Sequence, residues 1–311
     1  MRLPVVLRFL GAPRLARSGA IVVAAGLLAT LAAPVGAAPL AGSIARTATS
    51  APAVAPAAVD GSASPSATPR VETSETTCDG YTVRVVTRPD AYDDQTPPPD
   101  PPASITVLAE DGTTVHAWTA PDIWSFAEVA FCRDLLGEGT SQLAYSLYSG
   151  GMHCCYTFVV LRLGNPVQEL LRADLLDTPA VTPRQLDRDG ALELVARDFR
   201  LEYLGGVPFV DTSPFPRIWA FRDGGYVDAT RAFPAVLKAD QKASLRELTR
   251  LRSQPGCTSD PYCLKGWALH FVAVSVLLGQ PTSVISRLPL DLSLRRWMLR
   301  YRPVVARTLA P

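Results

Sequence analysis

The chain has little lysine, little histidine and almost no net charge. Its 311 residues include 3 lysines against 27 arginines, 3 histidines, and 30 basic against 29 acidic side chains, a formal charge of +1. Beyond residue 77 the count is 24 basic and 26 acidic, a charge of about −2. This balance excludes a strongly basic surface, and with it a protein that binds nucleic acid. Three histidines and no C-x-x-C pair argue against a zinc site.

The sequence also lacks the short motifs that usually mark catalysis. No G-x-S-x-G, H-E-x-x-H or G-x-x-x-x-G-K-[ST] occurs. The hydrophobic fraction, 48%, is too high for a fully disordered chain, and the length allows one or two domains. We therefore expect a folded protein for which the sequence identifies no catalytic set.

No apolar run near the N-terminus is long enough to span a membrane. Gly19 to Ala33 is shorter than the roughly 20 residues that a spanning helix needs. It follows Arg2, Arg8, Arg14 and Arg17 and precedes small residues up to Ala38. Residues 1–38 are therefore predicted to be a cleaved secretory signal, with no membrane span left in the mature protein. Residues 39–77, rich in Ala, Pro, Ser and Thr, are predicted to form a disordered linker.

All cysteines follow the linker, and their even number in an exported chain indicates disulfides. They are Cys78, Cys132, Cys154, Cys155, Cys257 and Cys263. Cys257 and Cys263 bracket a tight loop and are expected to pair. Cys154 and Cys155 are adjacent, and neighbours on a strand point to opposite faces of the sheet. We expect them to pair with Cys78 and Cys132, in either combination, in a secreted or cell-envelope protein.

Residues 78–235 show short alternating runs and turn signals, which predict antiparallel strands. The strands are expected over Tyr81 to Thr87, Ser104 to Leu108, Thr113 to Trp118, Gln142 to Tyr148, Tyr156 to Leu163, Val167 to Ala173, Leu192 to Phe199, Arg217 to Phe221 and Tyr226 to Ala229. A ten-residue stretch from Asp134 matches one from Gln185 at an offset of 51. Farther along, Thr157 matches Arg217 at an offset of 60, so nine residues are inserted near Gly205 to Pro214. With an earlier hairpin at Gly112 this predicts about three blade-like units. Since a closed propeller usually needs four to eight blades, we expect a small open or sandwich-like β domain.

Residues 236–311 change to helical periodicity, which makes the predicted fold class α+β. Helices are expected over Gln241 to Arg252, with Asp240 as N-cap, over Leu264 to Leu278, and over Asp291 to Arg302. The middle helix is apolar almost all round and contains His270, which we interpret as a buried, hydrogen-bonded histidine because no catalytic partner is identifiable. The last helix is basic and amphipathic, which is also typical of binding to an anionic surface.

The stretch from Leu186 to Leu194, L-D-R-D-G-A-L-E-L, resembles the D-x-D-x-D-G-x-x-[DE]-L loop of FG-GAP/VCBS repeats. The resemblance covers about residues 126–235, and Y-S-G-G-M-H-C-C, from Tyr148 to Cys155, is similar to secreted bacterial proteins with such repeats. It implies a calcium-stabilised β repeat used for binding or structure rather than a defined activity.

The family's ligand positions fall on Gln185, Asp187, Asp189 and Glu193, with Gly190 at the turn. Calcium prefers six to eight oxygen ligands, several of them carboxylates, and a glutamine supplies an oxygen without charge. Calcium is therefore a hypothesis for this loop; the alternative is that Asp187 and Asp189 cap turn amides. In the equivalent loop from Asp134, Leu136 and Gln142 replace ligands, which predicts a metal-free turn.

The leading hypothesis is a secreted, disulfide-stabilised binding or structural protein that recognises a protein or an envelope polymer. The alternative is an extracytoplasmic hydrolase with a site around Gly150 to Cys155, using His153 with Asp187 or Asp189. A third hypothesis is a peripheral envelope protein held by its C-terminal arginines. The sequence leaves open the oligomeric state and whether the repeats close alone or with another chain.

Overall fold

The computed structural model describes residues 71–87, 102–121, 125–149, 155–260 and 262–310. All of them belong to one compact unit, Ser64–Pro311. The predicted signal, residues 1–38, and most of the predicted linker lie outside the described residues.

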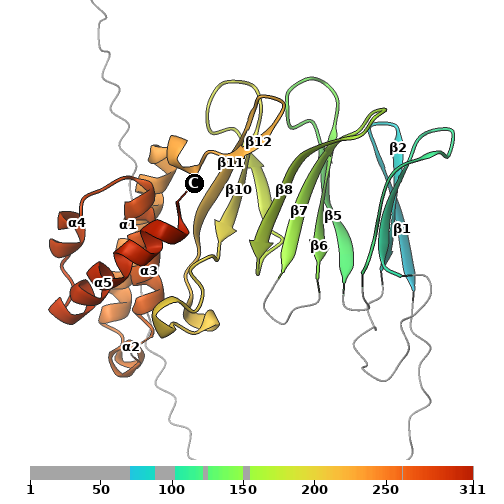
Figure 1. Ribbon diagram of the computed structural model, residues 1–311. Coiled ribbons are helices and arrows are strands. Elements are labelled where there is room, and N and C mark those ends of the chain that lie inside the picture. The colour runs from blue at the N-terminus through green and yellow to red at the C-terminus, as the bar shows by residue number, and fades with distance from the viewer. Residues whose placement is uncertain (1–70, 88–101, 122–124, 150–154, 261, 311) are drawn as a thin grey trace, which may run out of the picture. The chain divides into compact units, whose positions relative to one another are not determined.

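Twelve strands in the described residues form three sheets of four strands, each antiparallel throughout (Figure 1). Sheet A has the order β1-β2-β3-β4, sheet B β5-β6-β7-β8, and sheet C β12-β11-β10-β9. The strands are β1 (Glu72–Cys78), β2 (Tyr81–Thr87), β3 (Ser104–Leu108), β4 (Thr114–Thr119), β5 (Phe126–Arg133), β6 (Gln142–Tyr148), β7 (Tyr156–Arg162), β8 (Gln168–Leu176), β9 (Val181–Arg184), β10 (Glu193–Asp198), β11 (Phe215–Arg222) and β12 (Gly225–Asp228). The three predicted β units are thus confirmed, and helices follow them.

Sheet B carries apolar residues on both faces. On β7, Phe158 and Val160 pack with residues of sheet C, whereas Val159 and Leu161 pack with residues of sheet A. Because successive side chains of a strand point to opposite faces, a strand covered on both faces must be apolar along its length. This explains the run T-F-V-V-L-R, which does not alternate.

Sheet A has only one apolar face, so the series of sheets ends there. Val83 and Val85 on β2 are buried against sheet B. Between them Arg84 is exposed, and Thr106 on β3 occupies the same outer face. A polar outer face allows a terminal repeat to meet solvent without a further sheet.

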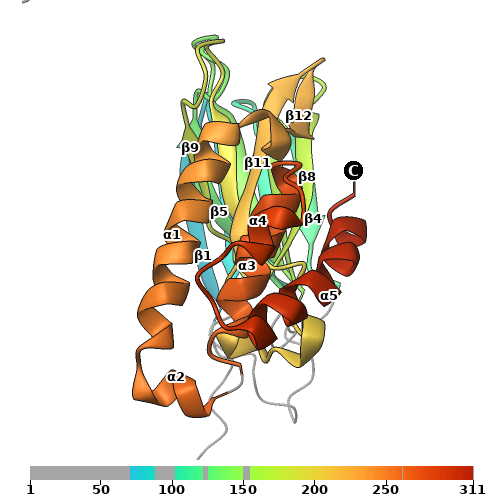
Figure 2. The same ribbon diagram turned by 90° about the vertical axis from the view of Figure 1, so that its left-hand side faces the viewer.

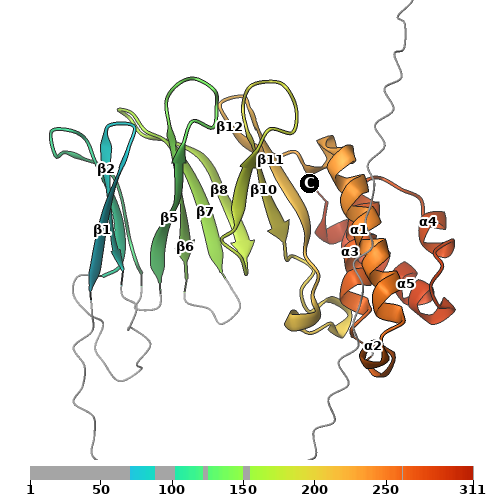
Figure 3. The ribbon, with the colours of Figure 1, turned by 180° about the vertical axis from the view of Figure 1, so that it is seen from behind.

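Helices cover the other face of sheet C (Figures 2 and 3). Ile218 and Ala220 on β11 pack with Phe233, and Phe215 joins the helical core. The α-helices are α1 (Pro234–Arg252), α2 (Pro255–Ser259), α3 (Lys265–Leu277), α4 (Ser283–Ser286) and α5 (Leu292–Thr308), and the 3-10 turns are η1 (Leu204–Gly206), η2 (Phe209–Asp211) and η3 (Thr230–Ala232). Of the thirteen residues of α3, eleven are buried, since this helix contacts α1, α5 and β11.

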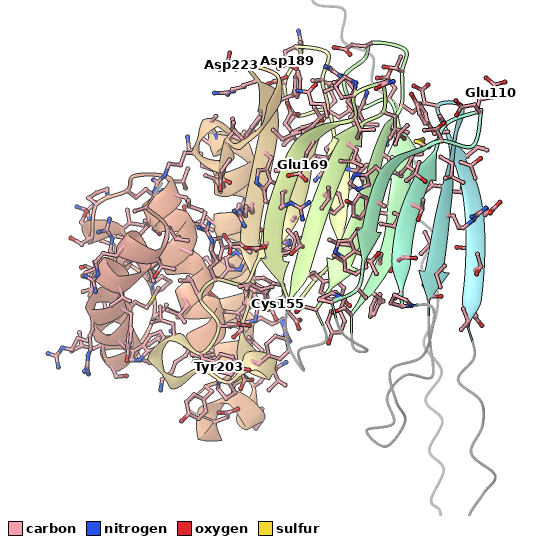
Figure 4. The ribbon with its side chains drawn as sticks, turned by 45° about the vertical axis from the view of Figure 1, so that its right-hand side comes forward. Glu110, Cys155, Glu169, Asp189, Tyr203 and Asp223 are labelled. Carbon is pink, nitrogen blue, oxygen red and sulfur yellow. A yellow bond between two sulfur atoms is a disulfide. The ribbon has the colours of Figure 1, made fainter. Side chains whose placement is uncertain are left out.

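The tight turns of all three sheets lie at one end of the strands, which we call the turn end. Figure 4 shows Glu110, Asp189 and Asp223 there, with Cys155 and Tyr203 at the opposite end. The alternation of strand direction in antiparallel sheets produces this arrangement. The connection from β10 to β11, residues 199–214, therefore lies at the end opposite the turn end.

The predicted disulfide between Cys257 and Cys263 is present, but the pairing proposed for Cys78 and Cys132 is wrong. These two residues are bonded to each other, with 5.6 Å between their Cα atoms. The expectation assumed that Cys154 and Cys155 lie on a strand, yet Cys155 precedes β7. Cys155 is also disulfide-bonded, and neither of the two described disulfides contains it. Cys154 lies outside the described residues.

Several element boundaries differ from those predicted. Strand β1 begins at Glu72, inside the predicted linker, because the Asp79-Gly80 turn lets it pair with β2. Helix α1 begins at Pro234, a residue favoured in the first helical turn, so Asp240 lies inside the helix and is not its N-cap. Helix α3 matches its prediction within one residue at each end. Helix α5 begins at Leu292, one residue after its predicted start at Asp291, and continues past Pro303 to Thr308.

Candidate functional site

Two equivalent loops meet at the turn end. Loop 1 is residues 134–141, between β5 and β6, and loop 2 is residues 185–192, between β9 and β10. The Leu192 amide N–H of loop 2 donates a 2.7 Å hydrogen bond to the Leu135 carbonyl of loop 1. At Gly137, which has a positive φ of 69°, a Cβ atom would lie 3.0 Å from the Gly190 carbonyl oxygen. Glycine therefore permits both the turn and the close contact of the two loops.

Loop 2 gathers the three carboxylates that the sequence predicted. One ligand atom from each of Asp187, Asp189 and Glu193 lies within 4.8 Å of the others. Glu193 is 1% exposed and accepts a 2.6 Å hydrogen bond from the Leu186 N–H. Asp187 and Asp189 each accept one backbone N–H, at 3.1 Å. These bonds match the predicted alternative of Asx capping, and they occupy only one oxygen of each carboxylate.

Burial raises the pKa of the Glu193 carboxyl, and the negative charges of Asp187 and Asp189 raise it further. The hydrogen bond from the Leu186 N–H acts in the opposite direction without cancelling these effects. A cation held among the three carboxylates would relieve this repulsion.

The fourth predicted ligand, Gln185, faces the same loop with its amide. Its Nε2 donates to the carbonyl oxygens of Asp187, at 2.8 Å, and Ala191, at 3.2 Å. In calcium loops of this spacing the seventh position, here Ala191, contributes its backbone carbonyl to the ion. The Gln185 NH₂ group thus donates to the same Ala191 carbonyl oxygen that would coordinate a bound cation. Rotating the amide by half a turn would present Oε1 instead, so the donor set fits calcium: three carboxylates, one amide oxygen and one carbonyl.

Loop 1 satisfies its polar groups without a cation. The Asp134 carboxylate accepts four backbone N–H groups, those of residues 136–139, at 2.8 to 3.2 Å. These N–H groups, that of Gly139 first, lower the Asp134 pKa. Gln142 stands where loop 2 has Glu193; its Oε1 accepts the Leu135 N–H and its Nε2 donates to the Thr140 carbonyl. The arrangement is that of a self-contained turn, as the replaced ligands suggested.

A second cluster, which the sequence did not reveal, joins sheet C to the helices. We call it the polar chain: Arg197 on β10, Asp240 on α1, His270 on α3 and Ser213 before β11. Ser213 Oγ lies 3.0 Å from His270 Nδ1, and His270 Nε2 is hydrogen-bonded to Asp240 Oδ2. Asp240 Oδ1 lies 3.0 Å from an Arg197 guanidinium nitrogen. No sequence signal pointed to these contacts, because Ser213 and Asp240 lie 57 and 30 residues from His270.

The polar chain borders a pocket of about 550 Å³. His270 is 3% exposed and its ring stacks on Trp267, with 5.5 Å between ring centroids. Burial alone would raise the pKa of Asp240, but its hydrogen bonds and charge interactions with His270 and Arg197 outweigh burial and lower it. The Asp240 carboxylate is therefore held in its charged form beside the imidazole.

Of the residues named for the alternative hydrolase site, the structure describes Cys155, Asp187 and Asp189, and the two aspartates lie far from Cys155. Asp189 and Cys155 lie at opposite ends of the strands (Figure 4). A seven-residue strand such as β7 spans roughly 20 Å, which places the carboxylates of loop 2 out of reach of a site beside Cys155. Residues 150–154, including His153, lie outside the described residues.

Comparisons with protein-family models, with curated proteins and with solved structures found no match for this chain. Among the described residues, no helix is both long and apolar enough to cross a membrane.

Proposed function

We propose that the protein is a secreted, disulfide-stabilised binding or structural protein built from degenerate FG-GAP/VCBS-like repeats. The observation that supports this most is the pair of equivalent loops at the turn end, which occupy the same place in successive sheets. Loop 2 has ligand-type residues at the four positions of such repeats, whereas in loop 1 Leu136 and Gln142 replace two of them. The Cys78–Cys132 disulfide joins β1 of sheet A to β5 of sheet B, as befits an extracytoplasmic protein.

Calcium, in this proposal, binds to loop 2 and stabilises the junction between sheets B and C. Asp187, Asp189 and Glu193 would supply charge, and Gln185 and the Ala191 carbonyl would supply two further oxygens. Calcium sites of extracellular modules typically bind at about 0.1–1 mM. At 10 mM calcium such a site adds roughly 1.4–2.7 kcal/mol to the free energy of unfolding.

The metal is tested by the melting temperature (Tm) of the mature protein in EDTA, in 10 mM calcium and in 10 mM magnesium. We expect calcium to raise the Tm by several degrees and magnesium, which requires a tighter octahedral shell, to raise it less. The Asp187→Asn/Asp189→Asn variant should lose the shift. Asp134→Asn is the matched control, because it alters loop 1 and should leave the calcium shift intact. A wild-type Tm that does not move in millimolar calcium removes the metal from the proposal.

The partner, in this proposal, is an envelope polymer or another extracytoplasmic protein that contacts the turn end. Glu110 and Asp223 are exposed at the tips of two turns there and take no part in the loop 2 cluster (Figure 4). Co-sedimentation of the mature protein with purified peptidoglycan sacculi measures polymer binding. The Glu110→Lys/Asp223→Lys variant should bind at least fivefold more weakly or more tightly, whereas Glu128→Lys on β5 should match the wild type. If all three proteins stay in the supernatant, an envelope polymer is not the partner. If they sediment equally, the turn end is not the contact surface.

A further inference from the structure

We propose that Ser213, His270 and Asp240 form a nucleophilic centre that hydrolyses carboxylic esters with a small acyl group. This activity is separate from the binding role proposed above and involves neither loop 1 nor loop 2. The three side chains come from three different elements and are joined by two hydrogen bonds, one at each nitrogen of the same imidazole ring. All three border the pocket of about 550 Å³, a volume within the usual range for small-molecule sites.

The hydrogen bonds give each group a defined role. The Asp240 carboxylate accepts only, so its contact with Nε2 places a proton on that nitrogen. The lone pair of Nδ1 is then free to accept the hydroxyl hydrogen of Ser213, 3.0 Å away. This is the arrangement of a serine nucleophile, a histidine base and an orienting carboxylate, with the two ring nitrogens exchanged relative to the serine proteases. Such centres are recognised by geometry and roles and recur on unrelated folds.

Packing fixes the imidazole in place. His270 is on α3, a helix that is buried along most of its length. The His270 ring stacks on Trp267, and hydrogen bonds to Ser213 and Asp240 hold its two nitrogens. Asp240 keeps its charge through the contact with Arg197, at 3.0 Å. An ionised carboxylate beside the ring stabilises the imidazolium that forms when the base takes a proton.

Two features of the chain bring Ser213 to His270. The connection from β10 to β11 has sixteen residues, 199–214, and its equivalent in sheet B has seven, 149–155, so nine residues are inserted as predicted. Ser213 lies in this inserted part. Gly266, in the first turn of α3, then allows the connection to approach the helix, because a Cβ atom there would lie 1.7 Å from the Asp211 carbonyl oxygen. The insertion and the glycine together place the hydroxyl against the ring.

The reaction proceeds in two balanced steps. Ser213 Oγ bonds to the ester carbonyl carbon while its proton moves to His270 Nδ1; the carbon–alkoxy bond then breaks, and the alcohol leaves with that proton. A water molecule next attacks the acyl carbon and gives a proton to Nδ1. The bond to Ser213 Oγ breaks, Oγ recovers the proton, and the carboxylic acid is released. The only co-reactant is water.

The first experiment treats the mature full-length protein with a fluorophosphonate, which phosphonylates activated serines, and reads the product by intact mass and peptide mapping. We expect one label per chain, on Ser213, and none in Ser213→Ala. Ser253→Ala is the control: Ser253 is exposed at the end of α1, outside the pocket, and its hydroxyl donates to the Arg250 carbonyl, so labelling should persist. No label in the wild-type protein, or a label that persists in Ser213→Ala, overturns the proposal.

The second experiment measures hydrolysis of p-nitrophenyl acetate. Ser213→Ala should return the rate to that of buffer, and Ser253→Ala should keep the wild-type rate. Asp240→Asn, nearly isosteric, should lower kcat at least tenfold, and its Tm is recorded beside the rate. If Asp240→Asn does not fold, the labelling rate of the wild-type protein is measured against pH instead, and a rate that does not fall toward acid pH excludes His270 as the base. Equal rates for the wild type and Ser213→Ala would also overturn the proposal.

Discussion

Gln185 and Gln142 stand at opposite ends of two equivalent loops, and each donates its side-chain amide to the carbonyl at the same loop position. Gln185 donates to Ala191, and Gln142 donates to Thr140, which precedes Ala191 by the repeat offset of 51. A carbonyl turned toward the loop interior requires a donor or a cation. In loop 1 the donor is the amide of Gln142, the first residue of the strand that follows. Loop 2 is followed by Glu193 instead and its donor is Gln185, its first residue, which leaves three carboxylates close together.

The variant Glu193→Gln places after loop 2 the residue type that Gln142 places after loop 1. It should raise the Tm in EDTA by about 2–4 °C, the effect of about 1 kcal/mol in a domain of this size. The reason is that it removes a buried charge and its repulsion by Asp187 and Asp189, while Gln142 shows that an amide can accept the same backbone N–H. The calcium shift should disappear. Thermal melts in EDTA and in calcium measure the Tm increase and the loss of the calcium shift. A Tm in EDTA below that of the wild type would contradict the proposed repulsion.

Glu193 also makes the stability of the folded protein depend on pH. Because the pKa of Glu193 is raised above its ordinary value of 4.5, the folded protein keeps this proton where the unfolded chain has released it. Its contribution to stability is thus present below the ordinary pKa and is lost as pH rises through the raised pKa. In EDTA the Tm difference between Glu193→Gln and the wild type should grow with pH above 4.5. A Tm difference that is constant with pH would exclude Glu193 as the origin of the pH dependence.

The disulfide between Cys78 and Cys132 should contribute more stability than that between Cys257 and Cys263. The first closes a loop across 54 positions and the second across 6. The chain-entropy model gives about 4 kcal/mol and about 2 kcal/mol respectively. Denaturant unfolding of the two double Cys→Ala variants measures the difference. Equal losses would show that the denatured chain keeps sheets A and B together without the bond.

Arg231 should hold the ends of two helices in place. Its guanidinium donates to the carbonyls of Val276 and Leu277 at the end of α3, and of Leu309 beyond α5, at 3.1 to 3.3 Å. Charged hydrogen bonds to helix C-terminal carbonyls are favourable, so Arg231→Ala should lower the free energy of unfolding by about 1.5–3 kcal/mol. Arg250→Ala is the control, because Arg250 pairs with Glu247 on an exposed face and should change the Tm little. Equal losses of stability in Arg231→Ala and Arg250→Ala would contradict this role of Arg231.

Ser146 is an exception in the interior. It lies on β6, is 3% exposed, and its hydroxyl has no hydrogen-bond partner among the described residues. Leaving a buried hydroxyl unpaired costs about 1–3 kcal/mol, so Ser146→Ala should raise the Tm by about 2–4 °C. Ser275→Ala should do the reverse, because the Ser275 hydroxyl donates to Phe271 and accepts from Gln241. A lower Tm for Ser146→Ala would indicate an ordered water at the hydroxyl.

Most strands were predictable from local pattern. Tyr81–Thr87, Ser104–Leu108 and Gln142–Tyr148 have the predicted bounds, since alternation and glycine turns are local signals. The strands β1, β5 and β9 were missed. The segment Glu72–Cys78 is almost entirely exposed along one edge of sheet A, so its sequence carries no apolar face. Its strand form depends on pairing with β2, which composition alone does not encode.

Of the two candidate sites, one could be predicted from the sequence and the other could not. The ligand set of loop 2 was visible because all of its members lie within nine residues and follow a repeat. The polar chain was not visible in the sequence, because the residues around Asp240 predict a helix cap and those around His270 predict a single buried histidine. The disulfide between Cys78 and Cys132 was mispredicted for a related reason, since the strand rule concerned Cys154 and Cys155 and said nothing of which strands adjoin.

The order of residues by itself determined the antiparallel hairpins, the three units, the two matching loops and the buried α3 helix. Each of these depends on interactions over a few residues: turn glycines, side-chain alternation and apolar content. Only the tertiary structure decided that sheet B is covered on both faces, that Cys78 meets Cys132, and that Ser213 meets His270. Those contacts join segments more than fifty residues apart, and they form because the packing of three sheets and a helical layer leaves one arrangement that buries their apolar faces.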